Sequence, residues 1–331
     1  NIAERVRTSV AADPVVCTGQ HIQVTASIGV ATFPKDGREI DELLAKADAA
    51  LYEAKRTGRN RVQVVTGSSH NVFGMASQIE SALRSNRLRT AYQPIVNLRS
   101  GRVCGEQALA RIFTSDGRIL EADRFVPAAE QLRLLHQVDR RVARDAIARC
   151  VSRSLEGRAS EALFVNFSGD FLGRPDLMQD ILETMKRECA RCGLLEGMEK
   201  PLVVEISERE FVNGLKEAKQ VLRPFVDAGV RLAIDDFGTG FSSLTYLAEL
   251  PISFIKLARP LVAQVCTEPR VRSILLGVQE LANDLGMITL AEGIEDEATV
   301  QKLTELRIHW GQGYYFGMPV VPPPFAGKRL N

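Results

Sequence analysis

From about residue 88 onward, short runs of apolar residues alternate with segments in which apolar residues recur every three or four positions. The runs predict strands at 91–97, 103–110, 162–167, 201–206, 230–235, 252–257, 287–291 and 307–312. The spaced segments predict helices at about 122–132, 136–153, 175–192, 215–228, 269–285 and 296–306. This alternation indicates a mostly parallel sheet with helical crossovers, and about eight strands fit an α/β fold of the TIM-like (β/α)8 barrel type. An open, doubly wound sheet is the alternative.

The first 87 residues follow a different pattern. It predicts a helix at 2–10, a strand at 22–33, a helix at 38–57, a short strand at 61–65, a Gly/Ser-rich linker at 66–75 and a connecting helix at 76–87. The chain therefore divides into a partial α+β segment at 1–65, a linker with its helix at 66–87, and the barrel at 88–331. Because the chain begins at Asn1 within a predicted helix, we interpret it as a piece of a longer protein.

Composition excludes several classes of protein. The 331 residues include 42 Lys and Arg against 41 Asp and Glu, so the net charge of +1 argues against a partner that is a nucleic-acid polymer. No apolar run approaches the ~20 residues of a membrane span. Six cysteines are too few to indicate a disulfide framework in a chain of this length. They favour a reducing, cytoplasmic setting, although upstream regions of a longer protein could still anchor it to a membrane.

Polar side chains follow most of the predicted strands of the barrel at the point where each strand ends. They are Asn166, Glu205, Glu208, Asp235, Asp236, Lys256, Glu292, Glu295 and Gln312. One acidic residue after a strand is usually a helix N-cap. In a barrel, however, these ends meet at one face, where barrel enzymes carry their chemistry. Carboxylate and amide oxygens suit Mg²⁺, Mn²⁺ or Ca²⁺, and such ions can support phosphodiester hydrolysis.

Seven motifs spread over residues 88–325 closely resemble an EAL domain, the fold of cyclic di-GMP phosphodiesterases and receptors. They are AYQPIV (91–96), VNFS (165–168), VEISE (204–208), AIDDFGTGFSSL (233–244), IKL (255–257), AEGIE (291–295) and QGYYFGMP (312–319). Residues 1–65 resemble the C-terminal part of a GGDEF domain, the diguanylate cyclase fold, through VTASIGVA (24–31) and ADAALYEAKRTGRN (47–60). The chain is thus similar to a fragment of a tandem GGDEF–EAL protein.

The EAL resemblance implies a role for each matching residue. The ligands of Mg²⁺ or Mn²⁺ would be Asn166, Glu205, Asp235, Asp236 and Glu292. Lys256 would hold the catalytic water, and Glu208 would support the loop after the Asp pair. Contacts to cyclic di-GMP would come from Gln93, Arg111, Asp236, Glu295, Gln312 and Pro319. The arginine suits a phosphate because its guanidinium makes charge-assisted hydrogen bonds, and the proline suits an apolar contact to a guanine.

Two positions depart from the EAL pattern. The family pattern Gly-x-Glu-Ala-Leu-x-Arg reads Gly-Glu-Gln-Ala-Leu-Ala-Arg at 105–111, so Gln107 replaces a metal-binding glutamate. Glu106 cannot easily substitute because adjacent residues of a strand point to opposite faces. The family's aspartate two residues after Lys256 is Ala258 here. Loss of both acids predicts weak metal binding and poor hydrolysis. An engineered Glu-to-Gln exchange would explain the first departure but not the second.

The GGDEF-like part is incomplete because the signature turn that holds metal and nucleotide in that family is missing from the sequence. We therefore expect no cyclase activity, and we interpret Lys55 and Arg59, which match phosphate-contacting positions, as a solvated helix end. Cys189 and Cys192 form a lone CxxC on a predicted helix, which is weak support for a metal or redox site.

Two functional hypotheses follow. In the first, a degenerate EAL domain senses cyclic di-GMP, or has lost even that binding, and signals through a homodimer or a protein partner. In the second, the chain is a slow metal-dependent phosphodiesterase that opens cyclic di-GMP to the linear dinucleotide. A purely protein-binding scaffold is a weaker third hypothesis, because Arg111, Asp236, Glu295 and Gln312 are retained.

Overall fold

In a computed structural model, the chain forms two compact units, Asn1–Ser81 and Ala82–Asn331. The structure describes residues 2–12, 15–17, 20–22, 24–40, 43–44, 46–47, 50–51, 54, 60–64, 72–114, 116–157, 161–194, 198–238 and 245–322. Within these residues, no helix is both long and apolar enough to cross a membrane.

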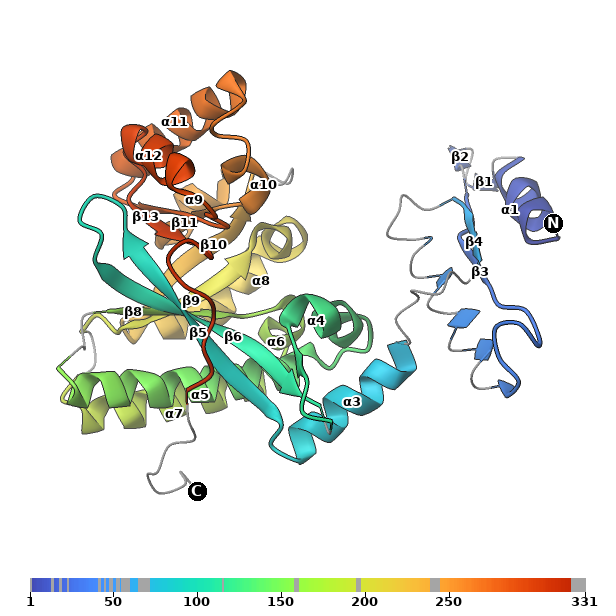
Figure 1. The fold of residues 1–331 in the computed structure, drawn as a ribbon, viewed down its shortest axis with the longest axis horizontal. Coiled ribbons are helices and arrows are strands. Elements are labelled where there is room, and N and C mark those ends of the chain that lie inside the picture. The colour runs from blue at the N-terminus through green and yellow to red at the C-terminus, as the bar shows by residue number, and fades with distance from the viewer. Residues whose placement is uncertain are drawn as a thin grey trace. The chain divides into compact units, whose positions relative to one another are not determined.

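The second unit is a closed ring of eight strands with helices around it (Figure 1). The strands are β5 (Leu88–Asn97), β6 (Val103–Phe113), β8 (Ala162–Asn166), β9 (Leu202–Ser207), β10 (Arg231–Phe237), β11 (Ile252–Leu257), β12 (Ile288–Ala291) and β13 (Trp310–Gln312). Pairing of β5 with both β13 and β6 closes the ring. The TIM-like barrel is therefore confirmed, and the open sheet is excluded.

One strand of the barrel runs against the others. β5 pairs antiparallel with β6 and with β13, whereas the remaining neighbours pair in parallel. The reason is the connection between β5 and β6, a tight turn closed by a hydrogen bond from the amide of Gly101 to the carbonyl of Asn97. Parallel strands need a crossover of a dozen or more residues, so a turn this short permits only a hairpin.

The helices around the barrel follow the predicted spacing. They are α4 (Ala122–Gln131), α5 (Leu135–Leu155), α7 (Pro175–Arg191), α8 (Glu208–Asp227), α11 (Pro269–Asp284) and α12 (Glu297–Glu305). Helix α8 begins at Glu208 rather than at the predicted 215, because Glu208 and Glu210 in its first turn favour a helix start and Gly214 does not stop it. Four short elements could not be predicted, because two to five residues are too few to show a periodic pattern. They are α6 (Gly169–Leu172), α9 (Thr245–Glu249), α10 (Arg259–Val262) and β7 (Ile119–Leu120).

The first unit contains α1 (Ile2–Ala12), β1 (Val15–Cys17), β2 (Gln20–Ile22), β3 (Ile28–Val30) and β4 (Val62–Val64). The single strand predicted at 22–33 is therefore wrong: β2 pairs back onto β1, and β3 pairs in parallel with β4. Helix α3 (Val72–Arg84) begins four residues before the predicted connecting helix, inside the expected linker. It stops early because Asn86 is left-handed, with φ 56°. Lys55 and Arg59 lie outside the described residues.

Two layers of inward-facing side chains fill the barrel. The apolar layer includes Phe164, Val203, Ala233, Phe254 and Leu290, with Trp310 packed against it. Because side chains of a strand alternate between its faces, the inward residue two positions later lies one step nearer the carboxyl ends. These next residues are Asn166, Glu205, Asp235, Lys256, Glu292 and Gln312. The register of the barrel therefore places a polar layer on an apolar one.

Candidate functional site

A buried ammonium group lies at the centre of the polar layer. Lys256 is fully buried, and its Nζ lies 2.7 Å from Oε1 of Glu205, 3.1 Å from Oδ1 of Asp235 and 2.6 Å from Oε1 of Glu292. Each of these carboxylates comes from a different strand end, on β9, β10 and just after β12. The lysine compensates much of the charge that the three acids bring together, although these contacts are not well-directed hydrogen bonds.

Three glutamine side chains continue this network across the antiparallel side of the barrel. Gln107 faces Gln93 in the register of β5 with β6. The Gln312 amide donates to Oε1 of Gln107 at 2.5 Å and to Oε1 of Gln93 at 2.8 Å. Gln107 in turn donates from Nε2 to Oε2 of Glu205 at 2.8 Å. Both oxygens of Glu205 are thus engaged, one by the Gln107 amide and the other by the Lys256 ammonium.

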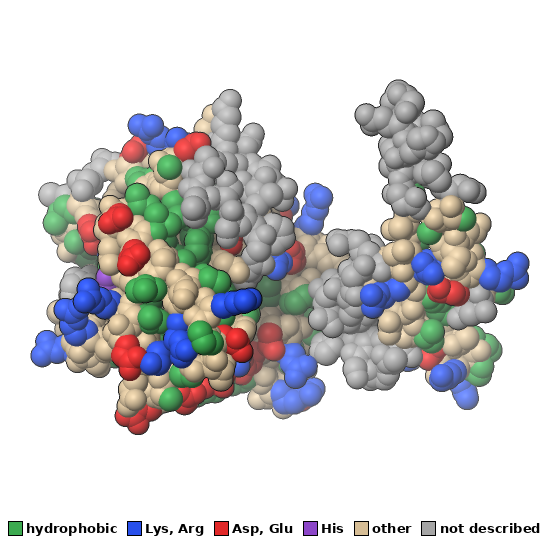
Figure 2. Space-filling model, turned by 90° about the horizontal axis from the view of Figure 1, so that it is seen from above, with side chains coloured by type: hydrophobic (Ala, Val, Ile, Leu, Met, Phe, Trp, Pro, Cys, Tyr) green, Lys and Arg blue, Asp and Glu red, His purple; other side chains and the backbone are tan. Residues whose placement is uncertain are grey.

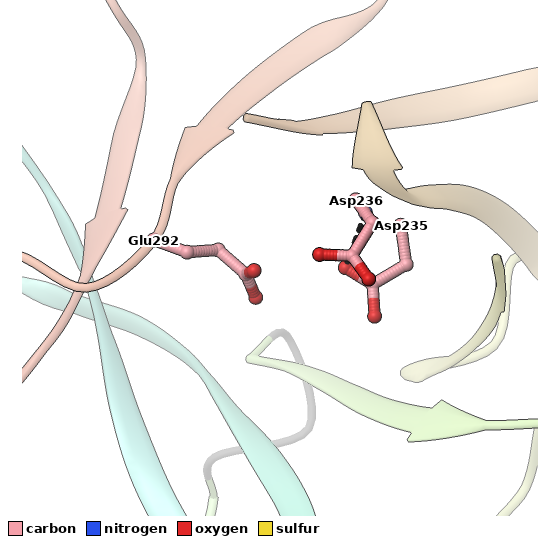
Figure 3. Close-up of side chains that lie close together, drawn as sticks. All are labelled: Asp235, Asp236 and Glu292. Carbon is pink, nitrogen blue, oxygen red and sulfur yellow. Dashed lines mark hydrogen bonds between the residues drawn. The ribbon is translucent and has the colours of Figure 1, made fainter. Parts of the chain in front are cut away.

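Two of the carboxylates that contact the lysine also lie close to a third, Asp236. Figure 3 shows Glu292 pointing toward Asp235 and Asp236, and one oxygen from each lies within 4.8 Å of the others. Asp236 has a positive φ of 56°, and its backbone amide donates to Oδ1 of Asp235 at 2.9 Å. Strained backbone of this kind, held by its surroundings, is typical of functional sites. Three hard oxygen donors this close could hold a divalent cation.

Burial and like charges raise the pKa values of these acids. Burial raises the pKa of Glu205 to about 8, and Lys256 opposes this by favouring the charged form. Burial likewise raises the pKa of Glu292 to about 7, and burial together with Asp235 raises the pKa of Asp236. The pKa of Lys256 lies well above its usual value because the carboxylates around it outweigh its burial. The pocket therefore carries more negative charge than it readily holds without a cation.

The residues fit one divalent cation better than two. Asp235, Asp236 and Glu292 present oxygens toward a common point. Glu205 is not part of this group, because one of its oxygens accepts from Gln107 and the other contacts Lys256, and a cation there would have to displace both. The Gln107 oxygen, the atom that could act as a ligand, is already the acceptor for Gln312.

Two further sequence-predicted residues lie beside this cluster. Asn166, half-buried at the end of β8, is in register with Glu205 of β9. Glu208 is fully buried at the start of α8, where it accepts from the backbone amide of Gly238 at 3.3 Å and from the hydroxyl of Tyr246 at 3.0 Å. Glu208 thus contacts both ends of the segment that follows the Asp pair; residues 239–244 of this motif lie outside the described residues.

Four of the predicted dinucleotide contacts come from strands β5, β6 and β13 and from the segment that follows β13. Gln93 and Gln312 belong to the glutamine network, and Gln93 also donates to the carbonyl of Gly317 at 3.0 Å. Arg111 is buried four residues beyond Gln107 on the same face of β6, and its guanidinium lies 3.8 Å from Glu121. Pro319 is half-buried in the segment after β13. These residues do not contact the lysine cluster directly.

Glu295 lies at the rim with a partner that the sequence did not indicate. Its Oε1 accepts from Nη2 of Arg259 at 2.6 Å, and both side chains are exposed. The stem of Arg259 crosses Gly293, where an added Cβ would lie 2.4 Å from its Cγ. The glycine of the AEGIE motif is the only sequence signal for this close approach.

Glu106 and Ala258, next to or at the two positions that depart from the EAL pattern, bring no carboxylate into the pocket. Glu106 lies on the opposite face of β6 from Gln107 and pairs there with Arg149 at 3.1 Å and with Arg153 at 3.5 Å. Ala258 is fully buried at the N-cap of α10, where it provides no side-chain cap. The expectation that Glu106 faces away from the pocket is confirmed.

Comparisons with known proteins agree with this architecture. A family profile described as "EAL domain" matches residues 76–319, and one described as "Diguanylate cyclase, GGDEF domain" matches residues 1–61. The chain is 30% identical to "Cyclic di-GMP phosphodiesterase NbdA" of Pseudomonas aeruginosa over 93% of its length and 39% of that protein. It is 32% identical to "Uncharacterized protein Rv1354c" of Mycobacterium tuberculosis over 96% of its length and 51% of that protein.

A solved structure described as "PaMucR Phosphodiesterase, c-di-GMP complex" superposes with a TM-score of 0.67 at 27% identity, covering 75% of this chain and 98% of that one. The chain spans only about two fifths to one half of the length of the two curated relatives it matches.

Replacing Lys256 with methionine tests whether its charge holds the cluster together. In EDTA, we expect Lys256→Met to lower the free energy of unfolding by about 3–5 kcal/mol, because buried carboxylates lose their counter-ion. Without the ammonium, the acids of the folded protein keep their protons to higher pH than those of the unfolded chain. Stability then falls as pH rises, so the deficit should be larger near pH 8 than near pH 5.

Urea denaturation at both pH values measures this difference. Lys302→Met is the matched control, since Lys302 pairs only at the surface of α12. An equal deficit at the two pH values would show that packing, rather than charge, accounts for the effect.

Proposed function

Because the chain belongs to the EAL domain family, we propose that it is a cyclic di-GMP signalling protein that binds this dinucleotide at the strand ends with little or no hydrolysis. The observation that carries the proposal is the hydrogen bond from the Gln107 amide to Glu205. A glutamine at this position removes a negative charge and also engages the carboxylate of its neighbour. The ligand class is supported by relatives described as a cyclic di-GMP phosphodiesterase and as a c-di-GMP complex.

Impaired metal binding is the physical reason for weak hydrolysis. Two divalent ions in one pocket repel each other and need several carboxylates to compensate. In this proposal Asp235, Asp236 and Glu292 hold at most one Mg²⁺ or Mn²⁺ well. Asn166 and Glu205 complete the ligand set only if Glu205 leaves Gln107 and Lys256. The proposed role of Lys256 in holding the attacking water also competes with its carboxylate contacts.

Ligand binding depends less on these losses. Contacts to phosphate and guanine would come from Gln93, Arg111, Asp236, Glu295, Gln312 and Pro319. Among the described residues, the guanidinium of Arg111 has no carboxylate closer than 3.8 Å, which leaves most of its N–H groups for a phosphate. The buried Oε1 of Gln312 lacks a hydrogen-bond partner among the described residues, so a ligand donor would relieve its desolvation.

A slow metal-dependent phosphodiesterase is the alternative. The observation that favours it is the retained set of Asp235, Asp236 and Glu292, which suits a divalent cation. Asp236 would then bind the metal ion and also contact the dinucleotide. No cyclase activity is expected of the GGDEF-like part, and the division into 1–65, 66–87 and 88–331 remains part of the proposal.

Calorimetry with cyclic di-GMP tests binding directly. We expect the chain to bind cyclic di-GMP in EDTA, and Arg111→Gln to weaken binding by about tenfold or more, because a buried charge-assisted contact to phosphate is lost. Arg118→Gln is the control, since Arg118 lies on the surface beyond the same strand.

A product assay with Mg²⁺ or Mn²⁺ separates the two functions. Little linear dinucleotide is expected over hours. Turnover at the rate of active relatives would reject the sensor and favour the phosphodiesterase, whereas the lack of any binding heat at high ligand concentration would reject both.

Restoring the acid at position 107 tests the role of the amide. In EDTA, Gln107→Glu should lower the free energy of unfolding by about 1–3 kcal/mol, because a donor to Glu205 becomes a facing carboxylate. Mg²⁺ or Mn²⁺ should recover this loss and raise the melting temperature more than in the parent chain. Gln107→Met, which removes the amide without adding charge, is the control. The proposal fails if the cation response of Gln107→Glu equals that of the methionine variant.

A homodimer through the barrel is also proposed. Apolar residues recur along α11 and its C-cap at alternating spacings of three and four, at Val271, Ile274, Val278, Leu281 and Leu285. Ile274 and Leu285 are 52% and 46% exposed, and hydrophobic side chains reach the surface on the face seen from above in Figure 2. This spacing is typical of a helix face that packs on another helix. A protein partner and a reducing cytoplasmic setting belong to the same proposal.

Light scattering of Ile274→Asp tests the dimer. We expect the parent chain to have the mass of two copies and the variant to have the mass of one, because a charge at the centre of a helix-packing face is desolvated on association. Ser273→Asp, one position away on the same helix, is the control. A parent chain that is monomeric at high micromolar concentration would contradict the dimer.

A further inference from the structure

Four arginines converge on a pocket that is separate from the lysine cluster and the glutamine network. The pocket has a volume of about 370 Å³ and lies where α5 and the start of α7 meet the end of α3. Its lining includes Arg140, Arg141, Arg144 and Arg174, with Leu83 and Leu177. None of these residues takes part in the lysine cluster or the glutamine network. We propose that this pocket binds the phosphate group of a small phosphomonoester.

Aspartates behind the arginines hold the guanidinium groups while using few of their donors. Arg140 donates from Nε to Asp180 at 3.0 Å, and Arg144 donates from Nη2 to both oxygens of the same carboxylate at 3.0 Å. A guanidinium has five N–H groups. Among the described residues these bonds leave most of the donors on both arginines available, and the two side chains are 40% and 47% exposed.

The other two arginines differ in how firmly they are held. Arg141 is fixed through Nε by Asp145 at 3.1 Å and through Nη1 by Asn86 at 2.5 Å, which leaves its Nη2 group. Arg174 lies 4.0 Å from Asp170, which is beyond hydrogen-bond length. Asp170 instead accepts from the backbone amide of His136 and contacts its ring nitrogen at 2.8 Å. Arg174 is therefore a cation with its donors largely unused in this part of the structure.

The balance of charges favours an anion at the surface of the pocket. Four arginines and one aspartate, Asp176, line it. Asp145, Asp170 and Asp180, which pair with the guanidinium groups, are not part of the lining. A phosphomonoester, with close to two negative charges and three acceptor oxygens, matches several guanidinium forks better than a carboxylate does.

The size and the apolar lining indicate that more than a phosphate ion is accommodated. Leu83 from α3 and Leu177 from α7 offer apolar surface beside the arginines. A volume of about 370 Å³ exceeds the needs of one phosphate and lies in the range of small-molecule pockets. A nucleoside monophosphate would place its phosphate on the arginines and its flat base against the leucines.

Calorimetry with adenosine 5′-monophosphate, inorganic phosphate and adenosine tests this site. Adenine is chosen because the proposed barrel ligand carries guanine. We expect the monophosphate to bind, adenosine alone not to bind, and higher NaCl to weaken the binding. Equal affinities for the monophosphate and inorganic phosphate would support the phosphate site and identify free phosphate as its source. Failure of both to bind at millimolar concentration would overturn the proposal.

Matched variants place the binding on the molecule. The double variant Arg144→Gln/Arg174→Gln should weaken binding of the monophosphate about tenfold or more, because two charge-assisted contacts are lost. Arg191→Gln, at the far end of α7, should bind as the parent does, as should Arg111→Gln in the barrel. Unchanged binding by the double variant, or loss of binding in Arg111→Gln alone, would overturn the proposal. Melting temperatures establish that each variant is folded.

Discussion

The ammonium of Lys256 is the interaction on which the polar end of the barrel depends. Carboxylates from three strand ends lie within 3.1 Å of this single cation, and the lysine and Glu205 are fully buried. Without compensation, such a group of acids would take up protons or force the strand ends apart. Its strand, β11, lies between β10 and β12 in the ring, which brings the ammonium among the ends of neighbouring strands. Closure of the barrel therefore brings the carboxylates together and also brings the ammonium that compensates their charge.

Much of this arrangement could be predicted from the alternation of residues along each strand. A β-strand has a period of two, so an apolar inward residue such as Phe254 places Lys256 on the same face and one step nearer the carboxyl end. The same step leads from Val203 to Glu205 and from Ala233 to Asp235. Because closed parallel strands share one carboxyl face, local patterns sufficed to bring these distant residues together. The outward position of Glu106 follows from the same rule.

Other features depended on interactions between segments and could not be predicted. The partner of an amide is one of them: Gln107 has both a donor and an acceptor, and its sequence gives no sign that Glu205 takes one and Gln312 the other. The Arg259–Glu295 pair likewise forms between residues 36 positions apart. The direction of β5 is different, since the five residues between it and β6 are too few for a crossover. That information was in the sequence, in the length of a loop rather than in periodicity.

The glutamine at position 107 contributes to the polar layer through hydrogen bonds rather than through charge. A glutamate there would face Glu205 with a second carboxylate and would need a cation to offset the repulsion. The amide instead donates to Glu205 and accepts from Gln312, so the same space is filled with complementary hydrogen bonds. Lys256 then supplies the positive charge that a metal would otherwise bring. The pocket therefore meets the hydrogen-bonding needs of the Gln107 amide and of one Glu205 oxygen from within, and it compensates part of the charge of its acids through Lys256.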